Sequence, residues 1–203
     1  MLIPLTVRSR FRRILEPLAR GFLAAGISPS TLTVIGFVPA VIAAIFFARG
    51  SVRLGGVLMG VSGIFDLADG LVARIGKRET KFGALLDSSI DRYSELAIFV
   101  GLAVLYRGDS GLYAVMLALT GSMMVSYTKA RAEGLGIPCN AGMLQRPERM
   151  VIVIVGALIG STVLRYAVWL VAVLANITAV ERLLKVRAAI NSTKQADSAG
   201  ETT

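Results

Sequence analysis

Six long apolar stretches dominate the chain, and their lengths are close to what a helix needs to cross a lipid bilayer. They cover residues 31–48, 54–75, 82–106, 112–129, 147–164 and 166–186. Short polar connections separate them near 49–53, 76–81, 107–111 and Arg165, and a longer connection covers 130–146. A backbone inside lipid must satisfy its own hydrogen bonds. The pattern therefore predicts an all-α integral membrane protein with about six transmembrane helices.

The residues before the first stretch show a different pattern. Apolar side chains recur there at helical spacing, with arginines between them, at Phe11, Ile14, Leu15, Leu18 and Phe22. This is typical of a juxtamembrane helix lying in the headgroup plane. Ser28 followed by Pro29 has the features of a helix start. We expect three parts: an amphipathic interfacial helix at 1–28, a six-helix transmembrane domain at 29–188 and a disordered cytoplasmic tail at 189–203.

The net charge of +9 follows the predicted membrane and is not spread evenly. The two ends of the chain and the connections at 76–81 and 130–146 hold most of the lysines and arginines. The opposite side holds only Arg49, Arg53, Arg107 and Arg165. By the positive-inside rule, we expect both termini and the active site to face the cytoplasm from the cell (inner) membrane, and we expect no nucleic-acid partner.

The chain has no histidine, and Cys139 is its single cysteine. Imidazole bases, histidine-ligated zinc and Ser-His-Asp triads are therefore excluded, as is an internal disulfide. Any base must come from a carboxylate, a lysine or a tyrosine.

Four aspartates interrupt the apolar sequence, at Asp66, Asp69, Asp87 and Asp91. A charged side chain at membrane depth costs roughly 2.5–3.5 kcal/mol on insertion scales, so a cationic partner is expected. Asp66 and Asp69 are three residues apart and Asp87 and Asp91 are four apart, which places each pair on one helix face. Two facing pairs would form an all-oxygen cage for two hard divalent cations, Mg²⁺ or Mn²⁺.

Carboxylate-held metals beside basic residues at a membrane surface indicate phosphoryl transfer on a lipid-linked substrate. Gly70 and Gly83 leave room for a bulky group close to the helix backbone. Arg74 is one turn beyond Asp69 and is suited to neutralising a phosphate. Asp91, the last of the series, is the best candidate for the base.

The pattern Asp66-x2-Asp69-Gly70-x2-Ala73-Arg74-x8-Gly83-x3-Asp87-x3-Asp91 resembles the CDP-alcohol phosphotransferase family at every fixed position. The resemblance implies that a CDP-linked lipid alcohol, usually CDP-diacylglycerol, donates its phosphatidyl group to an acceptor hydroxyl and releases CMP. A homodimer is typical of the family.

The resemblance also implies roles for individual residues. Asp66, Asp69 and Asp87 would hold one metal, and Asp66, Asp87 and Asp91 the second, with Asp91 also acting as the base. The positions that match those holding the CDP part of the donor are Pro29, Ser30, Thr31, Leu32, Gly70, Arg74 and Thr80.

Within the family, residues 126–133 and 146–149 are most similar to phosphatidylinositol-phosphate synthases. This implies that the phosphate of an inositol phosphate acceptor binds at Ser126, Lys129, Arg149 and Arg182. Glycerol 3-phosphate, serine or unphosphorylated inositol are alternative acceptors. A divalent-cation transporter is a remote alternative, because it would also place aspartates in membrane spans but leaves Gly70, Arg74 and Gly83 unexplained.

Overall fold

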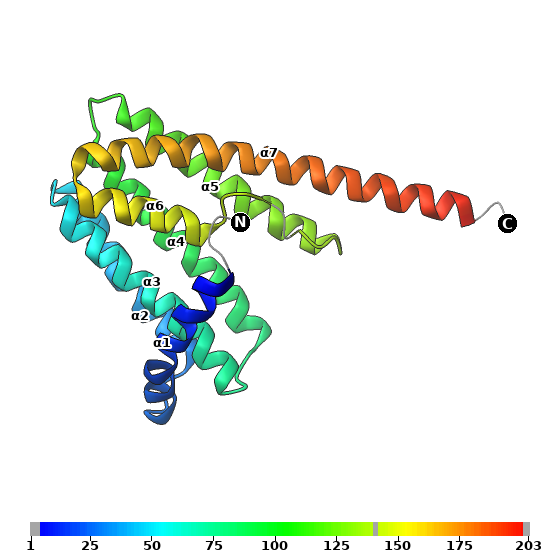
Figure 1. The fold of residues 1–203 in the computed structure, drawn as a ribbon, viewed down its shortest axis with the longest axis horizontal. Helices are drawn as coiled ribbons and strands as arrows, with labels where there is room; N and C mark the ends of the chain where they lie inside the picture. The colour runs from blue at the N-terminus through cyan, green and yellow to red at the C-terminus, as the bar shows by residue number, and fades with distance from the viewer. Residues whose placement is uncertain (1–4, 140–141, 201–203) are drawn as a thin grey trace.

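The computed structural model describes the backbone of residues 5–139 and 142–200 and the side chains of residues 14–139 and 142–191. Within these ranges the chain forms helices and no strand, which confirms the predicted all-α class (Figure 1). The helices are α1 (Leu5–Ala24), α2 (Pro29–Ala48), α3 (Val52–Ile75), α4 (Lys81–Leu105), α5 (Gly111–Gly134), α6 (Arg146–Ile159) and α7 (Ser161–Gly200).

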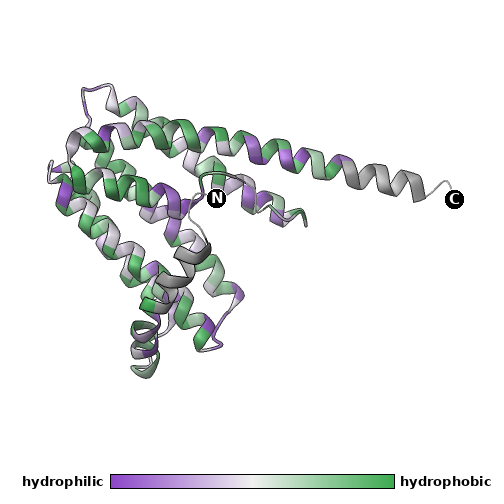
Figure 2. Cartoon of the chain, viewed as in Figure 1, coloured by the Kyte–Doolittle hydropathy of each residue, from purple (hydrophilic) through white to green (hydrophobic). Residues whose placement is uncertain are grey.

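Four of these helices are long and apolar enough to cross a membrane: α2, α3, α5 and the Ser161–Asn191 part of α7. Helix α4 has the length but carries four charged residues between Asp87 and Glu95. Helix α6 has 14 residues, and a helix of that length rises only about 21 Å, against a hydrocarbon core of about 30 Å. An integral membrane protein is therefore supported, whereas six spans remain a prediction. Figure 2 shows hydrophobic residues along the bundle and hydrophilic ones at the connection between α3 and α4.

The break between the last two helices lies at Gly160, so the predicted boundary at Arg165 is wrong. Gly160 has a φ of 154°, a backbone conformation that glycine adopts readily because it has no Cβ. Arg165 lies instead inside α7, where its Nη2 is 2.6 Å from Asp109 Oδ2 in the connection between α4 and α5. This ion pair explains why a charged residue is tolerated within the helix.

Helix α7 also runs further than the predicted sixth span and projects well beyond the bundle (Figure 1). Residues 181–190 are rich in leucine, lysine, arginine and alanine, which favour a helix. The helix continues to Gly200, into the segment 189–203 for which we predicted a disordered tail. The division into parts at 28/29 and 188/189 stays a prediction.

Two sets of contacts assemble the bundle. Helix α2 packs against α3 and α4, and α5 packs against α7. Helices α2 and α4 approach closely at Gly101, where an added Cβ would come within 2.7 Å of Ala44 Cα. A single core joins α2 through α7, with the fully buried Phe47, Leu102 and Val168 among its largest members. These contacts fix the relative positions of α2, α3 and α4, which carry the predicted site.

Helix α1 lies against α3, and its Ala19 is buried with Leu32 of α2 and Val72 of α3. Ile14 and Leu18 are exposed, as expected for a helix with an apolar side available to lipid. The predicted position Phe11 falls outside the described side chains. The helix start at Ser28 is confirmed, because the Ser28 hydroxyl accepts a hydrogen bond from the Thr31 amide at 3.1 Å.

Candidate active site

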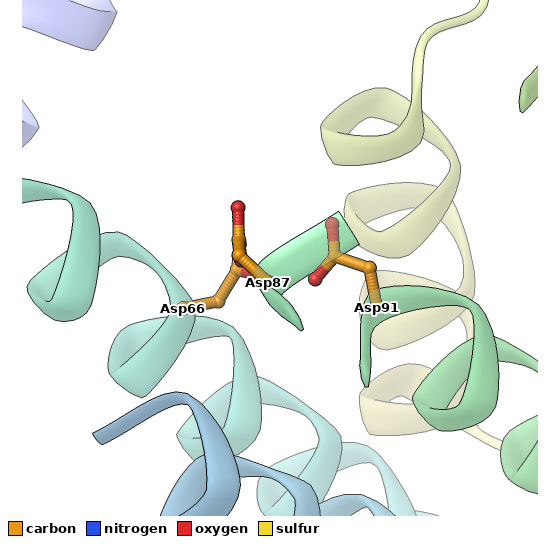
Figure 3. Close-up of side chains that lie close together, drawn as sticks. All are labelled: Asp66, Asp87 and Asp91. Carbon is orange, nitrogen blue, oxygen red and sulfur yellow. The ribbon is translucent and has the colours of Figure 1, made fainter. Parts of the chain in front are cut away.

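Three of the four predicted metal-binding aspartates converge between α3 and α4 (Figure 3). Asp66 extends from α3 toward Asp87 and Asp91 of α4, and one carboxylate oxygen from each lies within 4.8 Å of the others. All three side chains are half-buried. Because the donors are carboxylate oxygens, they suit Mg²⁺, Mn²⁺ or Ca²⁺ rather than a soft metal. The residues present therefore fit the predicted divalent cation.

Asp69 lies beside this group but is not one of the three. It is 4% exposed, and its Oδ2 accepts a hydrogen bond from Thr33 Oγ1 at 2.6 Å. Thr33 belongs to α2, so the hydroxyl fixes this carboxylate across the interface between α2 and α3. Thr33 was not predicted as a site residue, because its partner lies 36 residues away along the chain. The role of Asp69 as a metal ligand stays a prediction.

A cationic side chain meets the aspartates from a third helix. Arg146, the first residue of α6, places its Nη1 3.0 Å from Asp66 Oδ1 and 2.9 Å from Asp91 Oδ1. The cationic partner expected for charges at membrane depth is therefore present. We had not predicted Arg146 as its source, although it begins the segment 146–149 that carries part of the family resemblance.

A cavity of about 750 Å³ opens next to Asp69 and Asp87, between the starts of α2 and α4 and the end of α3. Five of the seven residues predicted to hold the CDP group line it: Pro29, Ser30, Gly70, Arg74 and Thr80. Arg78 and Lys81, which we had assigned only to the positive-inside pattern, line it as well. Three basic side chains, Arg74, Arg78 and Lys81, therefore line the same cavity as Asp87 of the carboxylate cluster.

Thr31 and Leu32 do not line this cavity. Leu32 is 1% exposed and packs against Ala19 and Val72, while the Thr31 hydroxyl lies 2.8 Å from the Ser28 hydroxyl. Successive residues of a helix point about 100° apart, so four consecutive residues cannot all face one side.

Local structure explains how the cavity is shaped. Thr80 caps α4 by accepting a hydrogen bond from the Gly83 amide at 2.9 Å. A Cβ at Gly83 would lie only 2.9 Å from the Thr80 hydroxyl, so glycine avoids a steric clash with the residue that caps α4. Arg74 is half-exposed, with its Nε 4.0 Å from Glu79 Oε1, a distance at which the side chain remains available to a ligand.

The four predicted acceptor residues lie on α5, α6 and α7, and none of them lines the large cavity. Arg149 is 2% exposed and forms a bidentate ion pair with Glu95 of α4, at 2.9 and 3.1 Å. Arg182 is also buried and donates to the Val125 carbonyl at 2.6 Å. Lys129 is nearly half-exposed, with its Nζ 3.7 Å from Glu133 Oε1, and Ser126 is half-buried. Their joint role in binding an acceptor phosphate stays a prediction.

Known proteins are similar to this chain in sequence and in fold. Residues 27–183 match the family described as CDP-alcohol phosphatidyltransferase. The chain belongs to this family. It is 36% identical over 190 residues to the phosphatidylinositol phosphate synthase of Mycobacteroides abscessus, with 89% of this chain and 86% of that protein covered. It is 37% identical over 183 residues to the archaetidylinositol phosphate synthase of Methanothermobacter thermautotrophicus, with 88% and 91% covered.

Solved structures of the phosphatidylinositol phosphate synthase of Mycobacterium tuberculosis have the same fold. The structure with CDP-DAG bound has a TM-score of 0.78 and 35% identity, and covers 86% of this chain and 94% of that one. The structure in complex with manganese and citrate has a TM-score of 0.76 and 35% identity, with 84% and 87% covered. The predicted family is confirmed, and this CDP-alcohol phosphatidyltransferase is an enzyme, which removes the transporter alternative.

Proposed function

We propose that this CDP-alcohol phosphatidyltransferase transfers a phosphatidyl group from CDP-diacylglycerol to a hydroxyl of inositol phosphate, giving phosphatidylinositol phosphate and CMP. The observation that carries the proposal is the convergence of Asp66, Asp87 and Asp91 beside the 750 Å³ cavity, which both Asp87 and Arg74 line. The 36% identity of this chain with a phosphatidylinositol phosphate synthase, over 89% of its length, supports the same assignment.

The donor lies with its CDP part in the large cavity. Its diphosphate faces Arg74, and Arg78 and Lys81 add positive charge along the same wall. Gly70 leaves the surface of α3 open, while Pro29, Ser30 and Thr80 line the cavity at the starts of α2 and α4. Thr31 and Leu32 contribute by holding the first turn of α2 in place.

The carboxylates would bind two divalent cations, Mg²⁺ or Mn²⁺. Asp66, Asp69 and Asp87 would hold one, and Asp66, Asp87 and Asp91 the other. When bound, such ions neutralise negative charge on a diphosphate and on its leaving oxygen. The oxygen-only donor set supports this assignment, and the relative solved with manganese agrees with it.

Asp91 removes the proton from the acceptor hydroxyl. One of its two carboxylate oxygens receives the proton. The hydroxyl oxygen then bonds to the lipid-bearing phosphorus, the bond from that phosphorus to the CMP oxygen breaks, and CMP leaves with the electron pair.

The acceptor is assigned from the relatives and from the basic residues. The names phosphatidylinositol phosphate synthase and archaetidylinositol phosphate synthase differ in the lipid and share inositol phosphate. Ser126, Lys129, Arg149 and Arg182 would bind its phosphate, because a dianionic group favours several cationic donors.

The same proposal places the enzyme in the cell membrane. Helices α4 and α6 would complete six spans by packing inside the bundle, and the positive-inside pattern would turn the site and both termini to the cytoplasm. A homodimer, typical of the family, is part of the proposal.

Release of CMP by the purified enzyme tests the proposal. The protein is supplied with CDP-diacylglycerol, Mg²⁺ or Mn²⁺, and in separate reactions inositol 1-phosphate, inositol, glycerol 3-phosphate or serine. We expect turnover with inositol 1-phosphate alone. Turnover with another acceptor would retain the transferase and overturn the roles of Ser126, Lys129, Arg149 and Arg182.

A further inference from the structure

Arg146 forms ion pairs with two of the carboxylates that are predicted to bind metal. Its Nη1 lies within 3.0 Å of one oxygen of Asp66 and one of Asp91, and its side chain is 18% exposed. Among the described residues its buried Nε has no hydrogen-bond partner. The guanidinium therefore forms ion pairs with two candidate metal ligands, while its Nε makes no hydrogen bond to the described residues.

The backbone that carries Arg146 is held in place. Two residues earlier, the Leu144 amide donates to Thr178 Oγ1 of α7 at 3.2 Å, and the Leu144 carbonyl accepts from Arg149 at 3.4 Å. A change of partner by Arg146 therefore needs rotation of its side chain only. Arg149, a predicted acceptor-phosphate residue, is three residues further on and shares the same side of α6.

Charge decides when such a change occurs. When all four aspartates are ionised, they carry four negative charges, which two divalent cations would neutralise. A guanidinium against Asp66 and Asp91 is then surplus positive charge beside positive ions, and like charges at this range repel. A dianionic phosphate bound beside Arg149 would offer Arg146 another partner in the proposed reaction.

We propose that Arg146 is an exchangeable counterion, which divalent cations displace from Asp66 and Asp91 and which then binds the phosphate of the acceptor. The first half concerns metal binding alone, while the second rests on the proposed function. Arg146 would thereby make acceptor binding depend on prior loading of the metal site.

Binding of Mn²⁺ without substrate tests the first half. The full-length protein in detergent is titrated with Mn²⁺ by calorimetry, as wild type, Arg146→Gln and Arg146→Lys. Removing the competing charge should tighten Mn²⁺ binding by about tenfold or more, the size of ordinary coupling between two sites. The shorter lysine should hold the carboxylates less closely and give an intermediate affinity, which also serves as the test if the glutamine variant does not fold.

Arg165→Gln is the matched control. It removes the same charge from an ion pair with Asp109, roughly 20 Å from Asp91 along α4. A hydrogen bond from the Gly111 amide, together with Arg165, lowers the pKa of Asp109, so this carboxylate is charged at neutral pH. We expect Arg165→Gln to leave Mn²⁺ affinity unchanged.

Two results would overturn the proposal. Mn²⁺ affinity in both Arg146 variants equal to or weaker than wild type would show that Arg146 does not compete with the metal. If affinity rises, the KM for inositol 1-phosphate should increase about tenfold in Arg146→Gln, as for loss of one charge-assisted contact, with little change for CDP-diacylglycerol. An unchanged acceptor KM would overturn the second half. Because calorimetry uses no substrate, its outcome is independent of whether the proposed reaction is right.

Discussion

Replacing Thr33 by valine tests whether the buried hydroxyl orients a metal ligand. Thr33 Oγ1 lies 2.6 Å from Asp69 Oδ2, and Asp69 is 4% exposed. Valine has nearly the same shape as threonine but no hydroxyl, so the variant removes the donor and keeps the packing of α2 on α3. We therefore expect a change in the orientation of Asp69 without a change in the fold.

The expected size follows from the contact. A hydrogen bond to a charged group contributes roughly 1.5–3 kcal/mol, and each 1.4 kcal/mol is about tenfold in affinity. Binding of Mn²⁺ should therefore weaken by about 10- to 100-fold, which is also the usual effect of removing an outer partner of a metal ligand.

Calorimetric titration of the detergent-solubilised protein with Mn²⁺ measures this effect directly. Thr120→Val is the matched control, because the Thr120 hydroxyl donates to the Met116 carbonyl of its own helix on an exposed surface, at 2.9 Å. If Thr33→Val changes the affinity no more than Thr120→Val does, Asp69 does not bind metal or does not need Thr33 to do so.

Three further substitutions test other parts of the account. Arg74→Ala should raise the KM for CDP-diacylglycerol by about tenfold and leave the acceptor KM nearly unchanged, because Arg74 lines the donor cavity. Steady-state kinetics with each substrate varied would measure this, and an equal rise in both would argue against a donor role. In the same kinetic assay, Lys129→Ala should raise the acceptor KM and leave the KM for CDP-diacylglycerol nearly unchanged. Equal effects on the two KM values would count against the predicted phosphate pocket. Glu95→Ala should lower the free energy of unfolding by about 3–5 kcal/mol, because it leaves a buried arginine unpaired. Thermal unfolding would measure this loss against Glu181→Ala, which breaks an exposed pair worth about 0.3–0.5 kcal/mol, and equal shifts would contradict it.

The aspartate cluster could be predicted from the sequence because helix periodicity fixes which residues share a face. Asp87 and Asp91, four apart, had to lie together once α4 was a helix, and a facing partner on α3 completed the group. The ion pair from Arg146 to Asp66 joins residues 80 positions apart, and the Thr33 contact joins helices α2 and α3. Periodicity within one helix contains no information on such contacts.

The last two helices show a second limit. The sequence prediction placed the connection at the charged residue Arg165. In the structure Asp109 neutralises Arg165, so backbone conformation at Gly160 decides where α6 ends. A charge is a poor marker of a helix boundary when its partner comes from another connection.

The most direct test of the central claim is CMP release from CDP-diacylglycerol and inositol 1-phosphate by wild type and Asp91→Asn, with and without a divalent cation. Asp109→Asn, in the connection that follows α4, is the control for a lost carboxylate. The account predicts metal-dependent CMP release by wild type and by Asp109→Asn. It predicts none by Asp91→Asn, although this variant still binds the donor. Near-normal turnover by Asp91→Asn, or CMP release without any divalent cation, would contradict it.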